Sequence, residues 1–172
     1  MTAAAIVREF GLEPHPEGGF FRETYRAQDE VQTKDGKSFS AATLIYFLLQ
    51  GSDVSHFHRI ASDEIWLFHL GGPLRLFWID GKGRLDSVLL GSNWQAGEQL
   101  QWVVRSNTWF AARLEQPASY ALVSCAVAPG FDFADFEMAN HETMRKSYPR
   151  LYEEIIPLIS DSWSRQSGIS QQ

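Results

Sequence analysis

The sequence is poor in cysteine, in long apolar runs and in excess positive charge, and each shortage excludes a class of protein. Cys125 is the only cysteine in 172 residues, so no intrachain disulfide can form. No apolar stretch approaches the roughly 20 residues that a membrane-spanning helix needs. The 21 acidic residues outnumber the 15 basic ones, and this formal net charge of -6 disfavours a surface that binds nucleic acid or anionic membranes.

The N-terminal segment also lacks the basic start and apolar core of a secretion signal, so we expect a cytoplasmic protein. Hydrophobic residues make up 44% of the chain and aromatic residues 13%, which is enough apolar surface for one buried core. Cys125 lies in an apolar run, where we expect a small buried core residue rather than a nucleophile. The chain length fits a single domain.

Short apolar segments recur along the chain and are separated by turns rich in glycine. We predict strands over residues 20–26, 39–49, 64–70, 74–79, 85–90, 101–104, 109–114 and 120–127. The run over 39–49 is long enough to indicate a long or bent strand. This even spacing favours an antiparallel sandwich or small barrel over alternating strands and helices.

Helices are expected only near the two ends of the chain. Thr2 can cap a short helix that ends at Gly11, and Asn140 can cap another over 141–147. A further short helix is predicted over 150–156. The whole chain, 1–172, is therefore expected to form one domain. Its barrel core would span about 18–137, its C-terminal helices about 140–158 and a loose tail about 160–172.

His56, His58 and Glu64 form the strongest functional pattern in the chain. On an extended strand, residues two apart point to the same face, so the two imidazoles can touch one cation. Glu64 follows a short polar stretch that can turn the chain back beside them. Two nitrogens and one carboxylate suit a first-row transition metal and leave coordination positions open. The alternative interpretation is structural, with packed histidines and a glutamate at the end of a turn.

The spacing Gly51-x4-His56-x-His58-x5-Glu64-x6-Gly71 resembles the first motif of the cupins, which are small β-barrels. Two flanking segments, HPEGGFFRETYR and PGFDFADFE, resemble the hallmarks of an uncharacterised cupin branch with a single domain. The resemblance implies an all-β, single-domain cupin, that is, a double-stranded β-helix or jelly-roll barrel. It also implies a short N-terminal helix and one or two C-terminal helices.

Many metal-binding cupins carry a fourth ligand, a histidine, in a second motif. Phe110 stands at that position here, and Asn107 replaces a glycine of the preceding turn, where a positive φ is expected. The resemblance therefore implies a divalent metal (Fe, Mn, Zn or Ni) held by His56, His58 and Glu64 alone, with partial occupancy.

The pocket of such a barrel would be lined by residues on the strands around the motif. We predict for it the polar residues Arg22, Glu23, Tyr25 and Arg113 and the aromatic residues Trp66, Phe68 and Phe110. An arginine there would favour an anionic substrate through a bidentate contact. His15 is expected to be a turn residue, and the phenylalanines of segment 129–137 are expected to form an interface or a lid.

Three functions fit these features, because a fold does not fix a reaction. The favoured one is a metal-dependent isomerase, epimerase or oxygenase that acts on a small polar or anionic substrate, a class that includes carbohydrate-like compounds. The second is a metal-free sugar epimerase or isomerase, with His56 or His58 as base and Tyr46 or Tyr25 as acid. The third is a non-catalytic protein that binds a small ligand. The aromatic content and the strand over 39–49 also predict a homodimer.

Overall fold

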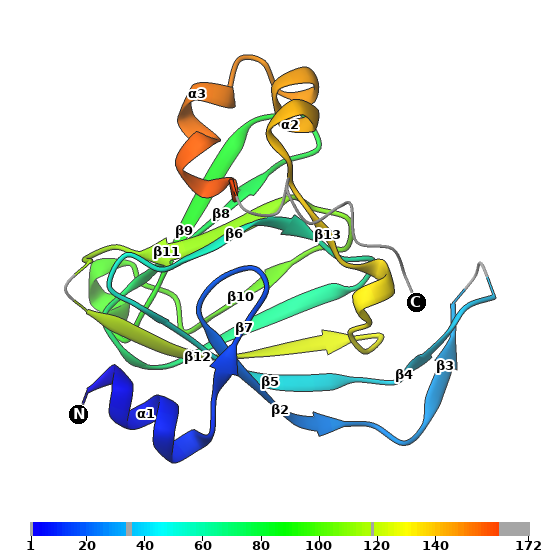
Figure 1. Cartoon of the computed structure of the whole chain (residues 1–172), viewed down its shortest axis with the longest axis vertical. Coiled ribbons are helices and arrows are strands. Elements are labelled where there is room, and N and C mark those ends of the chain that lie inside the picture. The colour runs from blue at the N-terminus through cyan, green and yellow to red at the C-terminus, as the bar shows by residue number, and fades with distance from the viewer. Residues whose placement is uncertain (1, 34–35, 118, 162–172) are drawn as a thin grey trace.

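Two antiparallel sheets face each other across an apolar interior (Figure 1). The computed structural model describes residues 2–33, 36–117 and 119–161. The six-stranded sheet has the order β1 (Glu13–Pro14), β2 (Phe20–Arg26), β5 (Thr43–Gln50), β12 (Tyr120–Ala128), β7 (Asp63–Gly71) and β10 (Gln101–Val104). The five-stranded sheet has the order β13 (Glu137–Met138), β6 (Val54–Arg59), β11 (Phe110–Leu114), β8 (Leu74–Ile79) and β9 (Leu85–Leu90).

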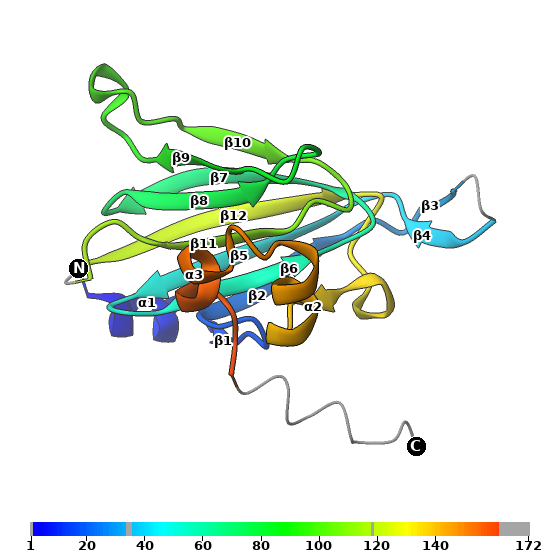
Figure 2. The same cartoon turned by 90° about the horizontal axis from the view of Figure 1, so that it is seen from above.

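A small hairpin, β3 (Glu30–Gln32) and β4 (Ser38–Ser40), projects from one end of this sandwich (Figure 2). The predicted strand over 39–49 is divided here into β4 and β5. At the division, Ser40 Oγ donates its proton to the Ala27 carbonyl at 2.8 Å and also lies 3.1 Å from the Ala42 carbonyl oxygen. The all-β jelly-roll prediction is confirmed.

Short helices cover the outer faces of the two sheets (Figure 1). Helix α1 (Ala3–Phe10) begins at Thr2, whose hydroxyl accepts the Ala5 N–H, and ends at Gly11 with φ 60°. Helix α2 (His141–Ser147) begins at Asn140, as predicted. Helix α3 (Tyr152–Ile155) starts two residues later than predicted, because Pro149 and Arg150 lie in a turn. The described residues also contain three 3₁₀ helices: η1 (Trp94–Ala96), η2 (Phe133–Asp135) and η3 (Ile156–Leu158).

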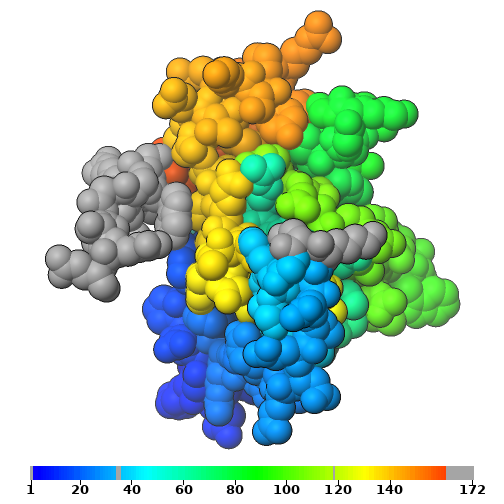
Figure 3. Space-filling view, turned by 90° about the vertical axis from the view of Figure 1, so that its right-hand side faces the viewer, coloured from blue at the N-terminus to red at the C-terminus, as the bar shows by residue number. Residues whose placement is uncertain are grey.

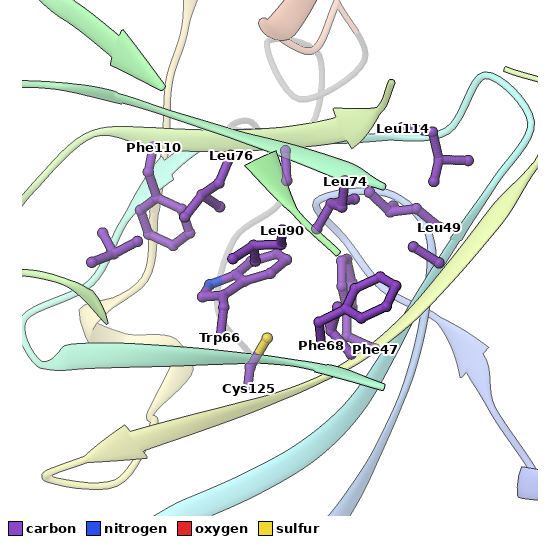
Figure 4. Close-up of a cluster of buried hydrophobic side chains, with 14 residues drawn as sticks. Phe47, Leu49, Trp66, Phe68, Leu74, Leu76, Leu90, Phe110, Leu114 and Cys125 are labelled. Atoms are coloured by element: carbon purple, nitrogen blue, oxygen red, sulfur yellow. The ribbon is translucent and has the colours of Figure 1, made fainter. Parts of the chain in front are cut away.

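Large apolar side chains fill the space between the sheets (Figure 4). Phe47, Trp66 and Cys125 come from the six-stranded sheet, and Leu76 and Phe110 come from the five-stranded sheet. All five are at most 2% exposed, so burial of this cluster stabilises the fold. Because the cluster occupies the middle of the barrel, only a small cavity can remain beside it.

β-Bulges decide which side chains face the interior. In β6, Ser55 and His58 pair with Ala112 and Phe110 of β11, so the four residues from Ser55 to His58 face only three residues of β11. In β2, the register against β5 shifts between Glu23 and Tyr25. An extra residue in a strand reverses which side chains beyond it point into the barrel and which point outward. Both bulges lie next to residues that the sequence assigns to the site.

None of the helices that the structure describes is long and apolar enough to cross a membrane. The predicted loose tail lies outside the described residues from 162 onwards. The homodimer stays a prediction.

Candidate functional site

A cavity of about 70 Å³ lies at one end of the barrel interior. Its lining residues are His15, Glu17, Phe21, Glu23, Arg26, Thr43, Ile45, His58, Ile60, Glu64, Cys125, Val127, Phe131 and Phe133. Five acid-base side chains, two histidines and three glutamates, therefore meet in a small space with mostly apolar walls. Such a combination is typical of a small-molecule site.

The six-stranded sheet supplies one wall of the cavity as two cross-strand rows. One row runs through Arg26, Thr43, Val127 and Glu64, which pair in that order across β2, β5, β12 and β7. The other runs through Glu23, Ile45 and Cys125 and continues to the core residue Trp66. Because directly opposed residues on antiparallel strands share a face, each row projects into the same space.

The turn between β1 and β2 brings Glu17 to the opposite side of the cavity. The His15 N–H donates to the Gly19 carbonyl and the Gly18 N–H to the His15 carbonyl, both at 3.0 Å. Gly18 has φ 112°, and a Cβ on it would overlap the carbonyl oxygen of Val54 in β6. Only glycine allows this approach, which places Glu17 against β6.

Glu17 makes two contacts with side chains of β6 through its carboxyl group. Its Oε1 accepts a hydrogen bond from Ser55 Oγ at 2.7 Å, and its Oε2 lies 3.2 Å from His58 Nε2. The other ring nitrogen of His58, Nδ1, lies 2.7 Å from the His56 carbonyl oxygen. A carbonyl only accepts hydrogen bonds, so Nδ1 carries a proton, and a neutral His58 has a bare Nε2 facing Glu17.

Burial shifts the pKa of both partners toward the uncharged form. Glu17 is 6% exposed and His58 2% exposed. Burial raises the pKa of Glu17, against the opposing effects of His15, the Ser55 hydroxyl and His56. Burial lowers the pKa of His58 to about 4. When Glu17 is protonated, its O–H can donate a hydrogen bond to the bare Nε2 of His58. The pair is therefore hydrogen-bonded when Glu17 carries its proton.

His15 adds a neutral imidazole to the same cavity. Its Nδ1 accepts the Glu17 backbone N–H at 3.2 Å, so the ring proton belongs on Nε2. The ring packs edge-to-face on Phe21, with ring centroids 4.5 Å apart. Burial lowers the pKa of His15.

Glu64 is the second buried carboxyl group of the cavity, and it is only 7% exposed. Burial, and then the nearby charge of Glu17, raise its pKa to about 8. The Cys125 thiol and the Trp66 indole act in the opposite direction. The indole N–H of Trp66 forms no hydrogen bond to any residue that the structure describes, and its effect on the pKa of Glu64 is the smallest of the four. At neutral pH, Glu64 is therefore mainly a carboxylic acid.

The ionisations of the two carboxyl groups are coupled. The charge of Glu17 raises the pKa of Glu64, so an ionised Glu17 favours a protonated Glu64. In the pH range between these two ionisations the cavity contains one carboxylate and one carboxylic acid. Two titratable groups with separated pKa values are the arrangement from which enzymes make a base and an acid.

The raised pKa of Glu64 predicts a pH-dependent stability difference in Glu64→Gln. In the wild type, the unfolded chain ionises near the ordinary pKa of 4.5, whereas the folded chain keeps the proton until about pH 8. The folded state binds more protons in that window, so wild-type stability falls as the pH rises through it. Glutamine does not titrate, so the Glu64→Gln variant lacks this loss of stability. The free energy of unfolding of the variant minus that of the wild type should therefore rise between pH 5 and 8, by at most about 1.4 kcal/mol per pH unit. Urea denaturation at several pH values measures this, and a constant difference would contradict it.

The predicted metal ligands are not gathered into one ligand set. In the ranges 2–33, 36–117 and 119–161, no three His, Cys, Asp or Glu side chains are arranged to hold a metal ion. The bulge in β6 is the reason, because it puts Ser55 on the face of His58 and removes His56 from it. His56 does not line the cavity, and its Nδ1 lies 2.7 Å from the Glu17 carbonyl oxygen. The residues present therefore do not fit the implied metal.

Of the predicted pocket residues, Glu23 lines the cavity together with His58 and Glu64. Trp66, Phe68 and Phe110 pack in the apolar core, and the Phe110 ring lies 4.1 Å from the His58 ring between centroids. Phe110 thus occupies space beside His58, as its position in the second motif suggests. Asn107 has the expected positive φ of 58°.

The other predicted pocket residues lie elsewhere. Tyr46 alternates with Ile45 and packs under α1 against Phe10, with ring centroids 5.2 Å apart. Tyr25 is 54% exposed, because the bulge in β2 aligns it with Leu44 rather than with Thr43. Arg22 donates to the Phe10 carbonyl at 3.0 Å, and the Arg113 guanidinium lies over the Phe77 ring. A tyrosine acid therefore has no place among the described cavity residues.

Sequence reasoning missed His15, Glu17 and Arg26, and it treated Cys125 only as a core residue. A usable signal was present, because two acid-base residues directly precede Gly18 and Gly19. Paired glycines mark a close approach of backbone to another segment, so the side chains beside them are held in place. Phe131 and Phe133 follow β12, and their loop (yellow) lies against the N-terminal strands (Figure 3).

Comparison with known proteins identifies close and distant relatives of the chain. The family model described as Cupin superfamily (DUF985) matches residues 4–139. An uncharacterised protein of Saccharomyces cerevisiae is 32% identical over 145 residues, which cover 76% of this chain and 71% of that protein. A hypothetical protein from Leishmania major is 34% identical, covers 94% of this chain and 100% of that one, and has a TM-score of 0.87.

A protein from Shewanella oneidensis is similarly related, with 35% identity, coverage of 93% and 98%, and a TM-score of 0.85. Oxalate decarboxylase from Bacillus subtilis shares the fold at a TM-score of 0.55, with 16% identity over 92% of this chain and 42% of that one. The decarboxylase has Mn(II) centres. At this identity the likeness extends to the fold alone.

Proposed function

The chain belongs to the DUF985 family of the cupin superfamily, and on that premise we propose that it catalyses proton transfer on a small hydroxycarbonyl compound, as an isomerase or epimerase does. One observation carries the proposal. Glu17, His58 and Glu64 line the same cavity, and burial shifts each of their pKa values toward the uncharged form. Perturbed acid-base groups in a shared cavity are the usual mark of proton-transfer catalysis.

Glu17 is the base of this reaction. Its carboxylate removes a proton from the carbon next to the substrate carbonyl, and that proton then lies on Oε2, within 3.2 Å of His58 Nε2. The bare Nε2 accepts the new hydrogen bond, because Nδ1 is committed to the His56 carbonyl. His58 thereby stabilises protonated Glu17 and strengthens Glu17 as a base.

Glu64 is the acid. It is protonated at neutral pH and donates to the carbonyl oxygen as negative charge develops there. Abstraction by Glu17 and donation by Glu64 convert the hydroxycarbonyl group to an enediol, with one C–H bond broken and one O–H bond formed. Return of the proton from Glu17 to the neighbouring carbon, with transfer of the proton of the other hydroxyl group to Glu64, gives the isomer and restores both carboxyl groups. Around the reacting atoms, Ile45, Ile60 and Val127 provide an apolar environment that strengthens these charge interactions.

No step of this proposal passes through a metal. The Mn(II) of oxalate decarboxylase belongs to a relative that shares only the fold, and the ligand set expected here is divided by the bulge in β6. The proton transfers are therefore assigned to this chain's own side chains.

The pH dependence of solvent exchange tests the proposal. We expect the protein to exchange the α-protons of dihydroxyacetone with D₂O, at a rate that rises as Glu17 loses its proton and falls above about pH 8 as Glu64 loses its proton. Proton NMR measures the exchange against a protein-free blank. In Glu64→Gln the exchange should be about 100-fold slower and should lose the alkaline decline. A Glu64→Gln profile that still falls near pH 8 would remove Glu64 from the mechanism.

A further inference from the structure

Arg26 is the only arginine or lysine among the described residues that line the cavity. It stands at the solvent-facing end, which we call the mouth, where its side chain is 47% exposed. Its Nε and Nη2 donate to the two carboxylate oxygens of Glu23 at 3.0 and 2.7 Å. Its remaining Nη1 donates to the Phe131 carbonyl at 3.2 Å. Nothing in the proton transfer described above uses this residue.

We propose that Arg26 is the anion-recognition residue of the pocket and that the substrate is a small hydroxycarbonyl compound with a carboxylate or phosphate group. The proposal rests on the proposed function for the hydroxycarbonyl part. The anionic part rests on Arg26 alone.

The contact with Glu23 shows the geometry that an anionic substrate would use. A guanidinium fork binds carboxylate and phosphate oxygens in the same two-point manner. Glu23 holds that position in the structure, and its side chain is 38% exposed. An ion pair between half-exposed partners contributes only about 0 to 1 kcal/mol, so an incoming anion can displace Glu23 at small cost.

The two ends of the cavity differ in a way that orients such a substrate. Glu17 and Glu64 are 6% and 7% exposed and lie at the inner end, where two carboxyl groups disfavour a further anion. With about 70 Å³ available, the cavity admits only a few non-hydrogen atoms. The hydroxycarbonyl part therefore enters, and the charged group stays at the mouth beside Arg26. The Arg26 contact with Phe131 also links anion binding to the loop over the cavity.

Arg22 provides a matched control on the same strand. Its guanidinium donates to the Phe10 carbonyl, where α1 ends, and it does not line the cavity. The sequence alone predicts Arg22 and Arg113 as the pocket arginines. The period of two on β2 places it on the outer face, opposite to Glu23.

Three probes with the same HOCH₂–CO head separate the anionic group from the rest of the ligand. Dihydroxyacetone is neutral, hydroxypyruvate carries a carboxylate, and dihydroxyacetone phosphate carries a phosphate. Calorimetric titration of the full-length protein should give at least one of the two anions an affinity about tenfold or more above that of dihydroxyacetone. The stronger anion tells which oxyanion the mouth prefers.

The variants assign that preference to a residue. Arg26→Gln should remove it, Arg26→Lys should reduce it, and Glu23→Gln should increase it about two- to fivefold because the competing carboxylate is gone. Arg22→Gln should leave it unchanged, and circular dichroism shows that each variant is folded. The proposal is overturned if neither anion binds better than dihydroxyacetone, if none of the three probes binds at millimolar concentration, or if Arg26→Gln keeps the preference.

The same samples distinguish a failure of this inference from a failure of the proposed function. Tight anion binding without proton exchange would support Arg26 and contradict the acid-base chemistry. Proton exchange without a binding preference for the anions would support the acid-base chemistry and contradict the role of Arg26.

Discussion

Glu17→Gln is expected to lower the rate of proton exchange about 100-fold or more while leaving the fold intact. The amide oxygen can still accept from Ser55 Oγ, and the amide N–H can donate to His58 Nε2 as the shared proton does in the wild type. Both contacts of the side chain are therefore preserved. The one property that is lost is the ability to take up a proton. Proton NMR of dihydroxyacetone in D₂O measures the rate, and thermal denaturation measures stability.

Glu13→Gln is the matched control for this prediction. It makes the same substitution four residues earlier, on an exposed side chain of β1 outside the cavity. We expect wild-type exchange in this variant. If Glu17→Gln and Glu13→Gln exchanged protons equally fast, Glu17 could not be the base.

Gly18→Ala is expected to destabilise the protein by about 3 kcal/mol or more. The methyl group would overlap the Val54 carbonyl oxygen, and a φ of 112° is strained for any residue with a Cβ. In a chain of this length such a loss corresponds to a fall in Tm of about 6 to 12 °C. Relief of the overlap would move the turn that carries Glu17, so the proton exchange rate should fall as well.

Gly97→Ala separates the overlap from the backbone strain. Gly97 also has a positive φ, 89°, but a Cβ there would meet no atom within 4 Å. Only the conformational cost applies, and a loss of about 1 kcal/mol is expected. Urea denaturation compares the two variants. Equal losses would mean that the contact between Gly18 and β6 contributes nothing.

The strands and the helix caps could be predicted because their signals are local. The predicted limits of β2, β8, β9 and β10 agree with the structure, since each is an apolar run between turn residues. The caps at Thr2 and Asn140 follow from side-chain chemistry within a few residues. His58 and Glu64 were found because their spacing belongs to a single strand-turn-strand unit.

The rest of the site depends on contacts that sequence spacing does not encode. A bulge is set by how two strands pair, and the bulge in β6 separates His56 from His58 although they lie only two residues apart. Glu17 reaches His58 across 41 positions because Gly18 lets the turn approach β6. The sequence assignment of Arg22 to the pocket differs from the cavity lining for a related reason. It required knowing which face of β2 is turned inward and where the bulge reverses it.

The central claim is that Glu17, His58 and Glu64 transfer protons through their own side chains, and exchange by metal-stripped protein tests it most directly. The protein would be treated with a chelator, checked by elemental analysis and incubated with dihydroxyacetone in D₂O. The account predicts that deuterium enters the α-position at the same rate before and after stripping and that Glu17→Gln abolishes this exchange. Exchange that disappears on stripping and returns only when a divalent metal is added would contradict the account.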